Sequence, residues 1–415
     1  MRCITDIHLH SRYSRACSKS LTLPNIALAC ERKGIDLVGT ADMTHPAWRA
    51  HMSEELEDTG NGTFALKGDR SKTRFVLSTE LSCIYKKGEK TRRLHHVVCL
   101  PDFAAVDKLI ASLDARGFNL KSDGRPILGI DSEELIKLVL DASDKALFIP
   151  AHAWTPWYAI FGSQSGFDSI EECFGDMSKH VHAIETGLSS DPPMNRRLSA
   201  LDDRLLVSNS DAHSPDKLGR EANVFEMETP SYMEMFRILT ERDRSKFIET
   251  IEFFPEEGKY HTDGHRDCNF SCEPAETKRM KNLCPKCGKP LTVGVLHRVD
   301  DLADRGADEP EPEGMVPYRY IIPLAELIAS VVGVGPSSKR VQGNVDQLVR
   351  DGHSEFGILL DEVEASLRER TDPEIAAAII AMREGRVDRK PGYDGVYGTI
   401  TVQTKGGPSQ ANLAI

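Results

Sequence analysis

The chain has 415 residues, of which 40% are hydrophobic and 28% are charged, and its formal net charge is −12. This length exceeds a usual single core and predicts two or three domains. The composition excludes a largely disordered protein, and no apolar run approaches the roughly 20 residues that span a bilayer. The acidic balance argues against binding of nucleic acid over the whole surface. Because no apolar signal segment opens the sequence, we expect a cytoplasmic protein.

Seven short apolar segments in the first half of the chain predict β-strands, and nearly every one ends in His, Asp or Glu. Helical stretches separate several of them, including residues 23–33, 104–116 and 132–142. This β-then-α rhythm predicts a parallel α/β barrel or a doubly wound sheet, and ligand-type residues on the strand ends favour the barrel. The predicted strands are residues 6–10, 37–42, 75–80, 95–98, 148–152, 182–185 and 207–213.

The residues at these strand ends are the types that bind divalent cations. His8 and His10 alternate along one strand and therefore share a face, and Asp211 and His213 repeat that spacing. Glu80 can bridge two metals through its two oxygens. Such a cluster predicts two or three cations, Zn²⁺, Mn²⁺ or Mg²⁺, that activate water for hydrolysis of a phosphate ester. Two further candidate ligands are Asp42 and His152.

Four of the ten cysteines are clustered after the predicted barrel, in two pairs separated by eleven residues. In a chain without a signal peptide such clusters favour metal over disulfides, and four thiolates predict a tetrahedral structural Zn²⁺ site. His261 and His265 lie nearby and are expected to pack beside the site rather than to bind the metal. The four predicted ligands are Cys268, Cys272, Cys284 and Cys287.

The remaining sequence is acidic and then helical in character. The run from residue 300 to 314 predicts a linker or a mobile loop. We therefore expect a barrel over residues 1–250, a zinc-binding module over 251–299, and an acidic linker with a small helical region over 300–415. The predicted helices are residues 323–332, 341–350, 355–367 and 372–384.

Several motifs resemble those of the PHP (polymerase and histidinol phosphatase) superfamily, namely residues 8–10, 39–42, 79–80, 150–152 and 210–213. The resemblance implies a distorted seven-stranded β/α barrel with a trinuclear metal site at the carboxyl ends of its strands. It implies catalysis by His8, Glu80 and Asp211. The implied ligand sets are His8, His10, Glu80 and Asp211 for one metal, Glu80, a strand histidine and His152 for a second, and Asp42 and His213 for a third.

Three positions leave alternatives. Asp42 stands where many members of the superfamily carry a histidine, so His45 is an alternative ligand. His95 and His96 are adjacent and face opposite sides of their strand, and His95 is the preferred strand histidine. Glu185 either binds a metal or orients a ligand.

Beyond the barrel, nearly the whole chain resembles the endonuclease Q family, on residues 44–48, 185–192, 210–215, 258–266 and 390–398. This resemblance implies a metal-dependent DNA-repair endonuclease that acts at deaminated bases (uracil, hypoxanthine or xanthine) or abasic sites. It would cut on the 5′ side of the lesion and leave a 3′-hydroxyl and a 5′-phosphate. The helical region would recognise DNA, and a replication or repair clamp protein is left open as a further partner.

Some residues are candidates for contact with DNA, and two other functions stay open. The glycine-dense residues 392–398 indicate either close approach of the backbone to DNA or to the barrel, or a tight β-turn with two packed tyrosines. A phosphatase for a small monoester is disfavoured because such a substrate needs no zinc module. A non-catalytic DNA-binding accessory protein is disfavoured by the nearly complete ligand set. The candidate contacts are Tyr13, Trp48, Glu185 and Tyr393, and further aromatic candidates for an extruded base are Trp154, Trp157 and Tyr158.

Overall fold

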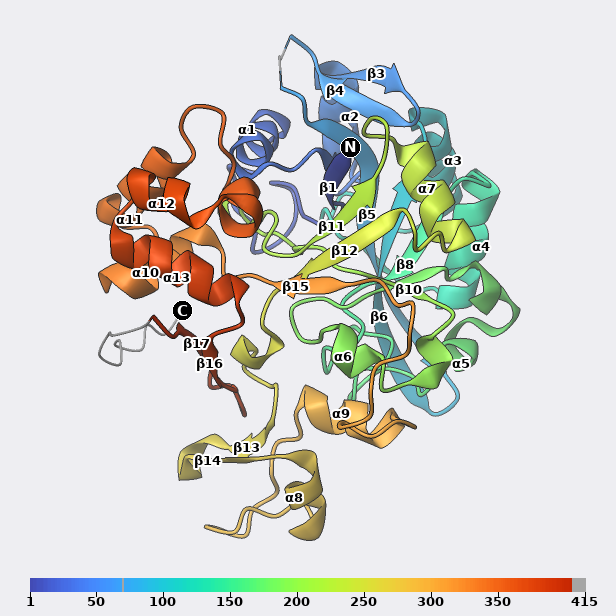
Figure 1. Ribbon diagram of the computed structural model, residues 1–415. Helices are drawn as coiled ribbons and strands as arrows, with labels where there is room; N and C mark the ends of the chain where they lie inside the picture. The colour runs from blue at the N-terminus through green and yellow to red at the C-terminus, as the bar shows by residue number, and fades with distance from the viewer. Residues whose placement is uncertain (69–70, 405–415) are drawn as a thin grey trace. The chain divides into compact units, whose positions relative to one another are not determined.

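The structure is a computed structural model that describes residues 1–68 and 71–404. The chain divides into two compact units (Figure 1). The first contains Met1–Glu31, Ile35–Ile251 and Leu302–Tyr318, and the second contains Arg32–Gly34, Glu252–Asp301 and the described residues 319–404. Among the described residues, no helix is both long enough and apolar enough to cross a membrane.

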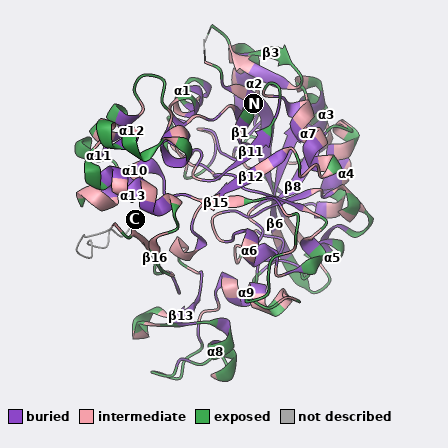
Figure 2. Ribbon diagram, in the orientation of Figure 1, coloured by how far each residue is buried: buried purple, intermediate pink, exposed green. Residues whose placement is uncertain are grey.

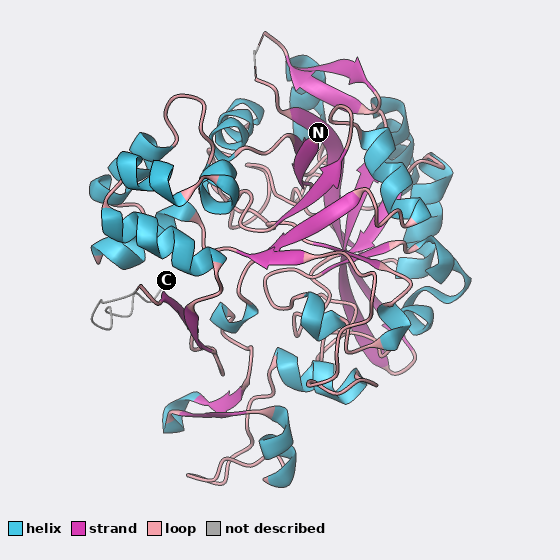
Figure 3. Ribbon diagram, viewed as in Figure 1, coloured by secondary structure: helices cyan, strands magenta, loops and turns pink. Residues whose placement is uncertain are grey.

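Seven strands of the first unit form a distorted α/β barrel, as the sequence predicts (Figure 3). β1, β2 and β5 pair in parallel, whereas β6 runs antiparallel to both β5 and β8. β9 and β10 pair in parallel, and a bridge between Leu9 and Ala212 joins the segments that follow β1 and β10. The strands are β1 (Arg2–Asp6), β2 (Leu37–Gly39), β5 (Arg74–Lys87), β6 (Lys90–Leu100), β8 (Leu147–Pro150), β9 (Ala183–Glu185) and β10 (Leu205–Val207).

The first and last barrel strands end earlier than the sequence predicts. Strands were expected over residues 6–10 and 207–213, but β1 and β10 stop before the ligand-bearing positions. Beyond β1, the backbone N–H of Ile7 donates to the Asn209 side chain (3.0 Å) instead of to a neighbouring strand. Side-chain bonds and the isolated bridge between Leu9 and Ala212 thus replace a continuous strand ladder, and both motifs become loops at the carboxyl ends of their strands.

Further strands extend the sheet, and helices cover its outer face. β11 and β12 continue antiparallel beside β1, and the β3–β4 hairpin lies beside β5. The strands are largely buried, whereas α3 and α4 expose one face (Figure 2). These elements are β3 (Leu56–Gly60), β4 (Thr63–Leu66), β7 (Ile127–Leu128), β11 (Ala222–Glu226), β12 (Phe247–Glu252), β15 (Tyr318–Tyr320), α1 (Leu23–Lys33), α2 (Pro46–Glu55), α3 (Phe103–Asp114), α4 (Ser132–Ala142), α5 (Ile170–Phe174), α6 (Pro192–Asn195) and α7 (Tyr232–Glu241).

A continuous hydrophobic core holds these strands in place. It includes Val76 of β5, Val97 of β6, Ile149 of β8 and Val207 of β10, and Ile238 of α7 packs with them. Each of these side chains is almost completely removed from water, which stabilises the fold by roughly 1.5–3 kcal/mol per residue. Because interiors of this kind are closely packed, the core fixes the strand ends that carry the candidate ligands.

The second unit contains the clustered cysteines and a helical region. The expected helix over residues 355–367 is divided, because a π-helical turn (Gly357–Asp361) ends in the extended residue Glu362 before α12 begins. Arg383 satisfies the end of that turn by donating to the carbonyl oxygens of Leu359 (2.9 Å) and Glu362 (2.6 Å). The elements are β13 (Asp263–His265), β14 (Phe270–Cys272), α8 (Pro274–Arg279), α9 (Val295–Leu302), α10 (Leu324–Val332), α11 (Lys339–Leu348), α12 (Glu364–Arg370), α13 (Pro373–Arg383), β16 (Val387–Lys390) and β17 (Thr399–Val402).

The acidic run after α9 forms ion pairs with other residues of the first unit. Glu311 forms an ion pair with Arg196, and Asp202 forms one with Arg305. Residues 302–318 belong to the same compact unit as the barrel, and these ion pairs are among their contacts with it.

Candidate metal centres

The strand-end residues meet in one buried cluster of imidazoles and carboxylates. Within the first group, His8, His10, Glu80 and Asp211 each offer one ligand atom, and these atoms all lie within 4.8 Å of one another. The His10 Nε2 atom is 3.0 Å from Asp211 Oδ1 and 3.4 Å from Glu80 Oε2. His8 Nε2 is 3.6 Å from Glu80 Oε1. Residues from three distant parts of the chain thus provide ligand atoms at a spacing that suits one cation.

A second group shares Glu80 with the first and adds His95 and His152. His95 Nδ1 is 2.7 Å and His152 Nε2 is 3.1 Å from the same Glu80 oxygen, Oε1. His96 faces the other side of β6, where its Nε2 lies 2.8 Å from the Ser132 hydroxyl. The structure therefore brings His95, and not His96, to the cluster, because consecutive strand residues alternate.

Asp42 and His213 flank His10 but form no such group of three among the described residues. Asp42 Oδ1 is 3.6 Å from His10 Nδ1, and the His213 ring centroid is 4.6 Å from that of His10. His45, the alternative to Asp42, caps α2 by accepting a hydrogen bond from the backbone of Trp48 (3.4 Å). Of these two alternatives, Asp42 therefore lies beside a ligand of the cluster, whereas His45 is engaged as a helix cap.

Three buried atoms of the cluster that could bind a metal have no hydrogen-bond partner, namely His8 Nε2, His10 Nδ1 and Asp42 Oδ1. A buried polar atom without a partner costs about 1–3 kcal/mol. The unpaired atoms belong to imidazole and carboxylate groups, which are ligands for divalent cations. The cluster therefore fits bound metal.

Glu185 holds His8 from behind. The His8 Nδ1–H donates to both carboxylate oxygens of Glu185 (3.0 and 2.9 Å), which leaves Nε2 as the atom directed to the cluster. Glu185 also accepts from the backbone N–H of His152 (2.8 Å) and from the Asn209 amide (2.9 Å). Metal-binding histidines commonly donate their other ring nitrogen to a carboxylate in this way. Of the two roles left open for Glu185, the contacts favour orientation of a ligand.

The carboxylates give the cluster a negative field that attracts cations. Burial alone would lower the pKa of His10, but Asp211 and Asp42 raise it to about 9. Burial alone would raise the pKa of Glu80, but His95, Arg125 and His8 hold it well below its ordinary value. In the absence of metal, a proton on His10 balances part of this negative charge, and metal binding would displace it.

Arg125 is a member of the cluster that the sequence did not indicate. Its Nη1 donates to Glu80 Oε2 (2.9 Å), and its side chain is 26% exposed. The preceding residue, Gly124, lies so close that a Cβ there would be 2.0 Å from Asp42 Oδ2, so the loop can pass here only with glycine. A single arginine in a polar loop carries no spacing signal, which is why it was missed.

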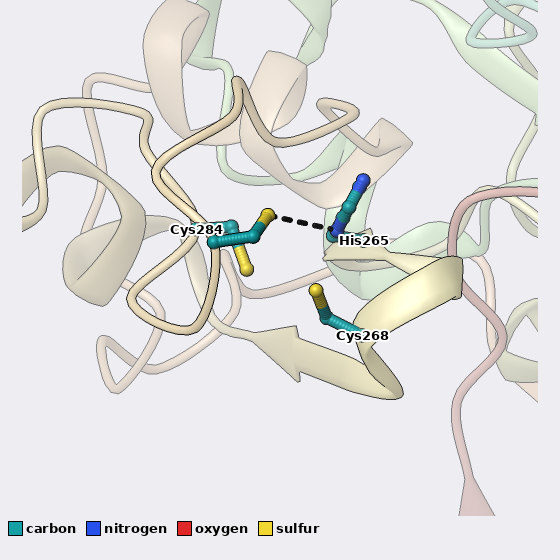
Figure 4. A group of neighbouring side chains, drawn as sticks. His265, Cys268 and Cys284 are labelled. Atoms are coloured by element: carbon teal, nitrogen blue, oxygen red, sulfur yellow. Dashed lines mark hydrogen bonds between the residues drawn. The ribbon is translucent and has the colours of Figure 1, made fainter.

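The clustered cysteines form a second centre with one unexpected member. His265, Cys268, Cys284 and Cys287 offer ligand atoms within 4.8 Å of one another, and the side chains of the three residues labelled in Figure 4 converge. The His265 Nδ1 atom is 3.5 Å from Cys287 Sγ. Burial raises the pKa of the Cys284 thiol, but the backbone N–H groups of Lys286 and Cys287 lower it to about 7.

The expected ligand Cys272 lies outside this group, and His265 takes its place. In the β13–β14 hairpin, His265 pairs with Phe270 next to the turn, whereas Cys272 pairs with Asp263 at the other end. The Cys272 thiol is buried and lies 3.2 Å from the Thr277 hydroxyl. The expectation that His265 only packs is corrected by the hairpin register, which brings it beside Cys268.

Two of the candidate DNA contacts are packing residues. Trp48 is 1% exposed, and its indole N–H donates to the carbonyl oxygens of Thr40 and Ala41 (both 3.0 Å). Tyr393 is 7% exposed within the second unit. Its backbone closes a turn with Val396, and its hydroxyl donates to Asn269 (2.8 Å). The glycine-dense residues 392–398 therefore form a tight turn.

Tyr13 and Glu185 differ from these two. The Tyr13 ring is half-buried and stacks on His45 with centroids 4.5 Å apart, and its hydroxyl lies 3.0 Å from His51 Nε2. Glu185 is completely buried behind His8, so it acts on that ligand and is not accessible to DNA.

Two solved structures are similar to this chain over nearly its full length. The chain is 31% identical to the lesion-specific endonuclease PfuEndoQ of Pyrococcus furiosus, with a TM-score of 0.85 over 97% of this chain and 96% of that one. A second structure, endonuclease Q in complex with a 27-mer duplex that carries an abasic lesion at the active site, has 31% identity and a TM-score of 0.83 over 97% of each chain.

Two curated relatives are similar in sequence as well. The uncharacterized protein YqxK of Bacillus subtilis is 31% identical over 95% of this chain and 98% of its own length. The uncharacterized protein MJ0043 of Methanocaldococcus jannaschii is 32% identical over 60% of this chain, which corresponds to 31% of that longer protein. Residues 323–386 match the family model described as the MJ0043 C-terminal domain.

Proposed function

The chain belongs to the endonuclease Q family, and we propose that it hydrolyses the DNA phosphodiester on the 5′ side of a deaminated base or an abasic site. The observation that carries this proposal is a two-part cluster of buried ligands, joined by Glu80, in a chain that matches a lesion-specific endonuclease over 97% of its length. The lesion bases are uracil, hypoxanthine and xanthine, and the products are a 3′-hydroxyl and a 5′-phosphate.

In this proposal the two groups of the cluster hold divalent cations. His8, His10, Glu80 and Asp211 hold one cation, and Glu80, His95 and His152 hold a second. Asp42 and His213 complete a third position beside His10. The donor set suits Zn²⁺ or Mn²⁺, and Mg²⁺ would bind through the carboxylates.

The side chains around the cations have separate tasks. When bound, the cations supply Lewis acidity and an activated water for attack on phosphorus. Asp211 has a side chain that is 26% exposed, against 0% for Glu80 and 1% for His8, so the substrate approaches from its side. Arg125 is also accessible from solvent, and its guanidinium can bind a phosphate oxygen of the scissile group.

The cysteine-bearing centre has a structural task. His265, Cys268, Cys284 and Cys287 would close a tetrahedral Zn²⁺ site with no open position for a substrate. We place the enzyme in the cytoplasm, where clustered thiols stay reduced and free to bind metal. Because a lesion is rare along a duplex, a replication or repair clamp that holds the enzyme on DNA would fit this activity as a further partner.

A nicking assay on a panel of duplexes tests the proposal against its rivals. One duplex carries deoxyuridine, one deoxyinosine and one an abasic site, and an undamaged duplex of the same sequence is the control. We expect cleavage of the three lesion duplexes with Mg²⁺ or Mn²⁺. Equal cleavage of undamaged DNA, or turnover of p-nitrophenyl phosphate alone, would contradict the proposal and favour a non-specific nuclease or a phosphatase.

A further inference from the structure

Trp157 is the exposed tryptophan of this chain. Of the three tryptophans, Trp48 and Trp154 are each 1% exposed, whereas Trp157 is 46% exposed. Among the described residues of the first unit, no other aromatic side chain is as open to solvent. An isolated apolar residue at the surface needs no explanation by itself. A functional role for Trp157 therefore has to be argued from its position in the fold.

The turn that carries Trp157 is tied to both histidines of the second ligand group. The Thr155 hydroxyl lies 3.2 Å from His152 Nδ1 and donates to the carbonyl oxygen of Trp157 (2.9 Å). On the other side, the backbone N–H of His95 donates to the carbonyl oxygen of Tyr158 (3.0 Å). Neighbours of Trp157 on both sides therefore contact the candidate metal ligands.

The backbone of this turn is strained at Tyr158, the residue that follows Trp157. Tyr158 has a φ of +64°, which a bulky residue adopts at a cost of roughly 1–3 kcal/mol. Its ring packs on His95 with centroids 4.6 Å apart, and its N–H donates to the Ser165 hydroxyl (3.3 Å). These contacts hold the left-handed turn, so Tyr158 covers the metal ligand while the preceding residue faces solvent.

We infer that Trp157 is the stacking surface for the lesion base, a specificity-determining contact that rests on the proposed function. Within a duplex both faces of a base are covered by its neighbours, so an indole outside the stack can cover the face of a base only after that base has left the helix. Deaminated and mispaired bases leave most readily. An exposed indole on a turn that is bonded to His152 and His95 meets that requirement, and stacking tolerates uracil and the purine lesions alike.

The inference separates lesions that have a base from lesions that lack one. Stacking of a base on an aromatic ring contributes about 1–3 kcal/mol, which corresponds to about 5- to 150-fold in affinity. Trp157→Ala should weaken binding of the deoxyuridine and deoxyinosine duplexes by a factor in this range. The abasic duplex offers no base at that position and should bind within about twofold of the wild-type value. Trp157→Phe should restore most of the loss.

Fluorescence anisotropy on labelled duplexes in EDTA measures this without cleavage, and initial rates with Mn²⁺ should show the loss in KM rather than in kcat. Leu28→Ala, which removes another exposed apolar side chain of the first unit (65% exposed), is the matched control. Because the other two tryptophans are buried, binding of the deoxyuridine duplex should also protect the tryptophan fluorescence of the wild type from acrylamide.

Two outcomes would overturn the inference and are distinguishable. If wild-type protein binds and cuts lesion duplexes but Trp157→Ala behaves like wild type, or loses affinity equally for the abasic duplex, the stacking role is wrong and the proposed function stands. If wild-type protein shows no preference for any lesion duplex, the proposed function fails and the stacking role fails with it.

Discussion

Three candidate ligands have backbone conformations that residues with a Cβ rarely adopt. The φ angles are +42° at Asp42, +29° at His152 and +45° at Asp211. Each such residue costs roughly 1–3 kcal/mol and persists only where its surroundings fix it. Such strain clusters at functional sites, and here all three residues follow the carboxyl ends of barrel strands. Left-handed turns after β2, β8 and β10 thus place these side chains in or beside the buried cluster.

Among the candidate ligands, replacement of Asp211 tests the role of the cluster in cleavage most directly. Asp211→Asn keeps the shape of the side chain but removes the charge that faces His10. We expect cleavage of a deoxyuridine duplex to fall by more than about 10²-fold, because a ligand should matter more than a residue that only orients one. Circular dichroism and duplex binding should stay close to wild type. Cleavage at the wild-type rate would remove Asp211 from the centre.

Glu185 should act through His8. Glu185→Gln removes the charge behind His8 without a change of size, and residues in such a role typically contribute 10- to 100-fold in metal affinity or activity. We expect a loss in that range, together with weaker Mn²⁺ binding by calorimetry. The same substitution at Glu226, which is exposed on β11, is the matched control. A loss of activity with unchanged metal affinity would contradict this role.

Arg125 should act on the phosphate. We expect Arg125→Ala to lower kcat by about 10²-fold, as for loss of one donor to a developing charge, and Arg125→Lys to retain part of the rate. Arg15→Ala, which removes an arginine with a 77% exposed side chain paired with Asp123, should cut normally. A change confined to KM in Arg125→Ala would indicate ground-state binding of DNA instead.

At the level of elements, the strand-and-helix order of the barrel could be read from the sequence because periodicity and turn residues are local signals. The expected helices over residues 23–33 and 132–142 have the bounds observed for α1 and α4. Register is a non-local property, however. Whether His265 or Cys272 faces Cys268 depends on how β13 pairs with β14. The position of Arg125 depends on how its loop folds against Glu80, which no spacing encodes.

Zinc binding therefore distinguishes the two versions of the cysteine centre. His265→Ala should lower the zinc content measured by mass spectrometry and make residues 260–297 sensitive to proteolysis, because the segment depends on metal to fold. Cys272→Ala should retain zinc and lose no more than the packing of one small buried side chain. Loss of zinc in Cys272→Ala but not in His265→Ala would restore the four-cysteine site.

At the scale of the whole molecule, an acidic chain is proposed to bind a polyanion. The net charge of −12 disfavours contact with DNA over the whole surface, so attraction must be local. Cations in the barrel would supply part of it, because bound metal ions are often the largest charges in a site. If cleavage requires bound metal and tight binding requires a lesion, an acidic chain of this kind would leave undamaged DNA uncut.

The most direct measurement is therefore cleavage of a 5′-labelled duplex that carries one deoxyuridine, with the products resolved at single-nucleotide length. We predict one product that ends in a 3′-hydroxyl immediately 5′ to the deoxyuridine, formed with Mn²⁺ or Mg²⁺ and abolished by EDTA. A cut on the 3′ side, release of free uracil, or cleavage that persists after removal of metal would contradict the proposed reaction.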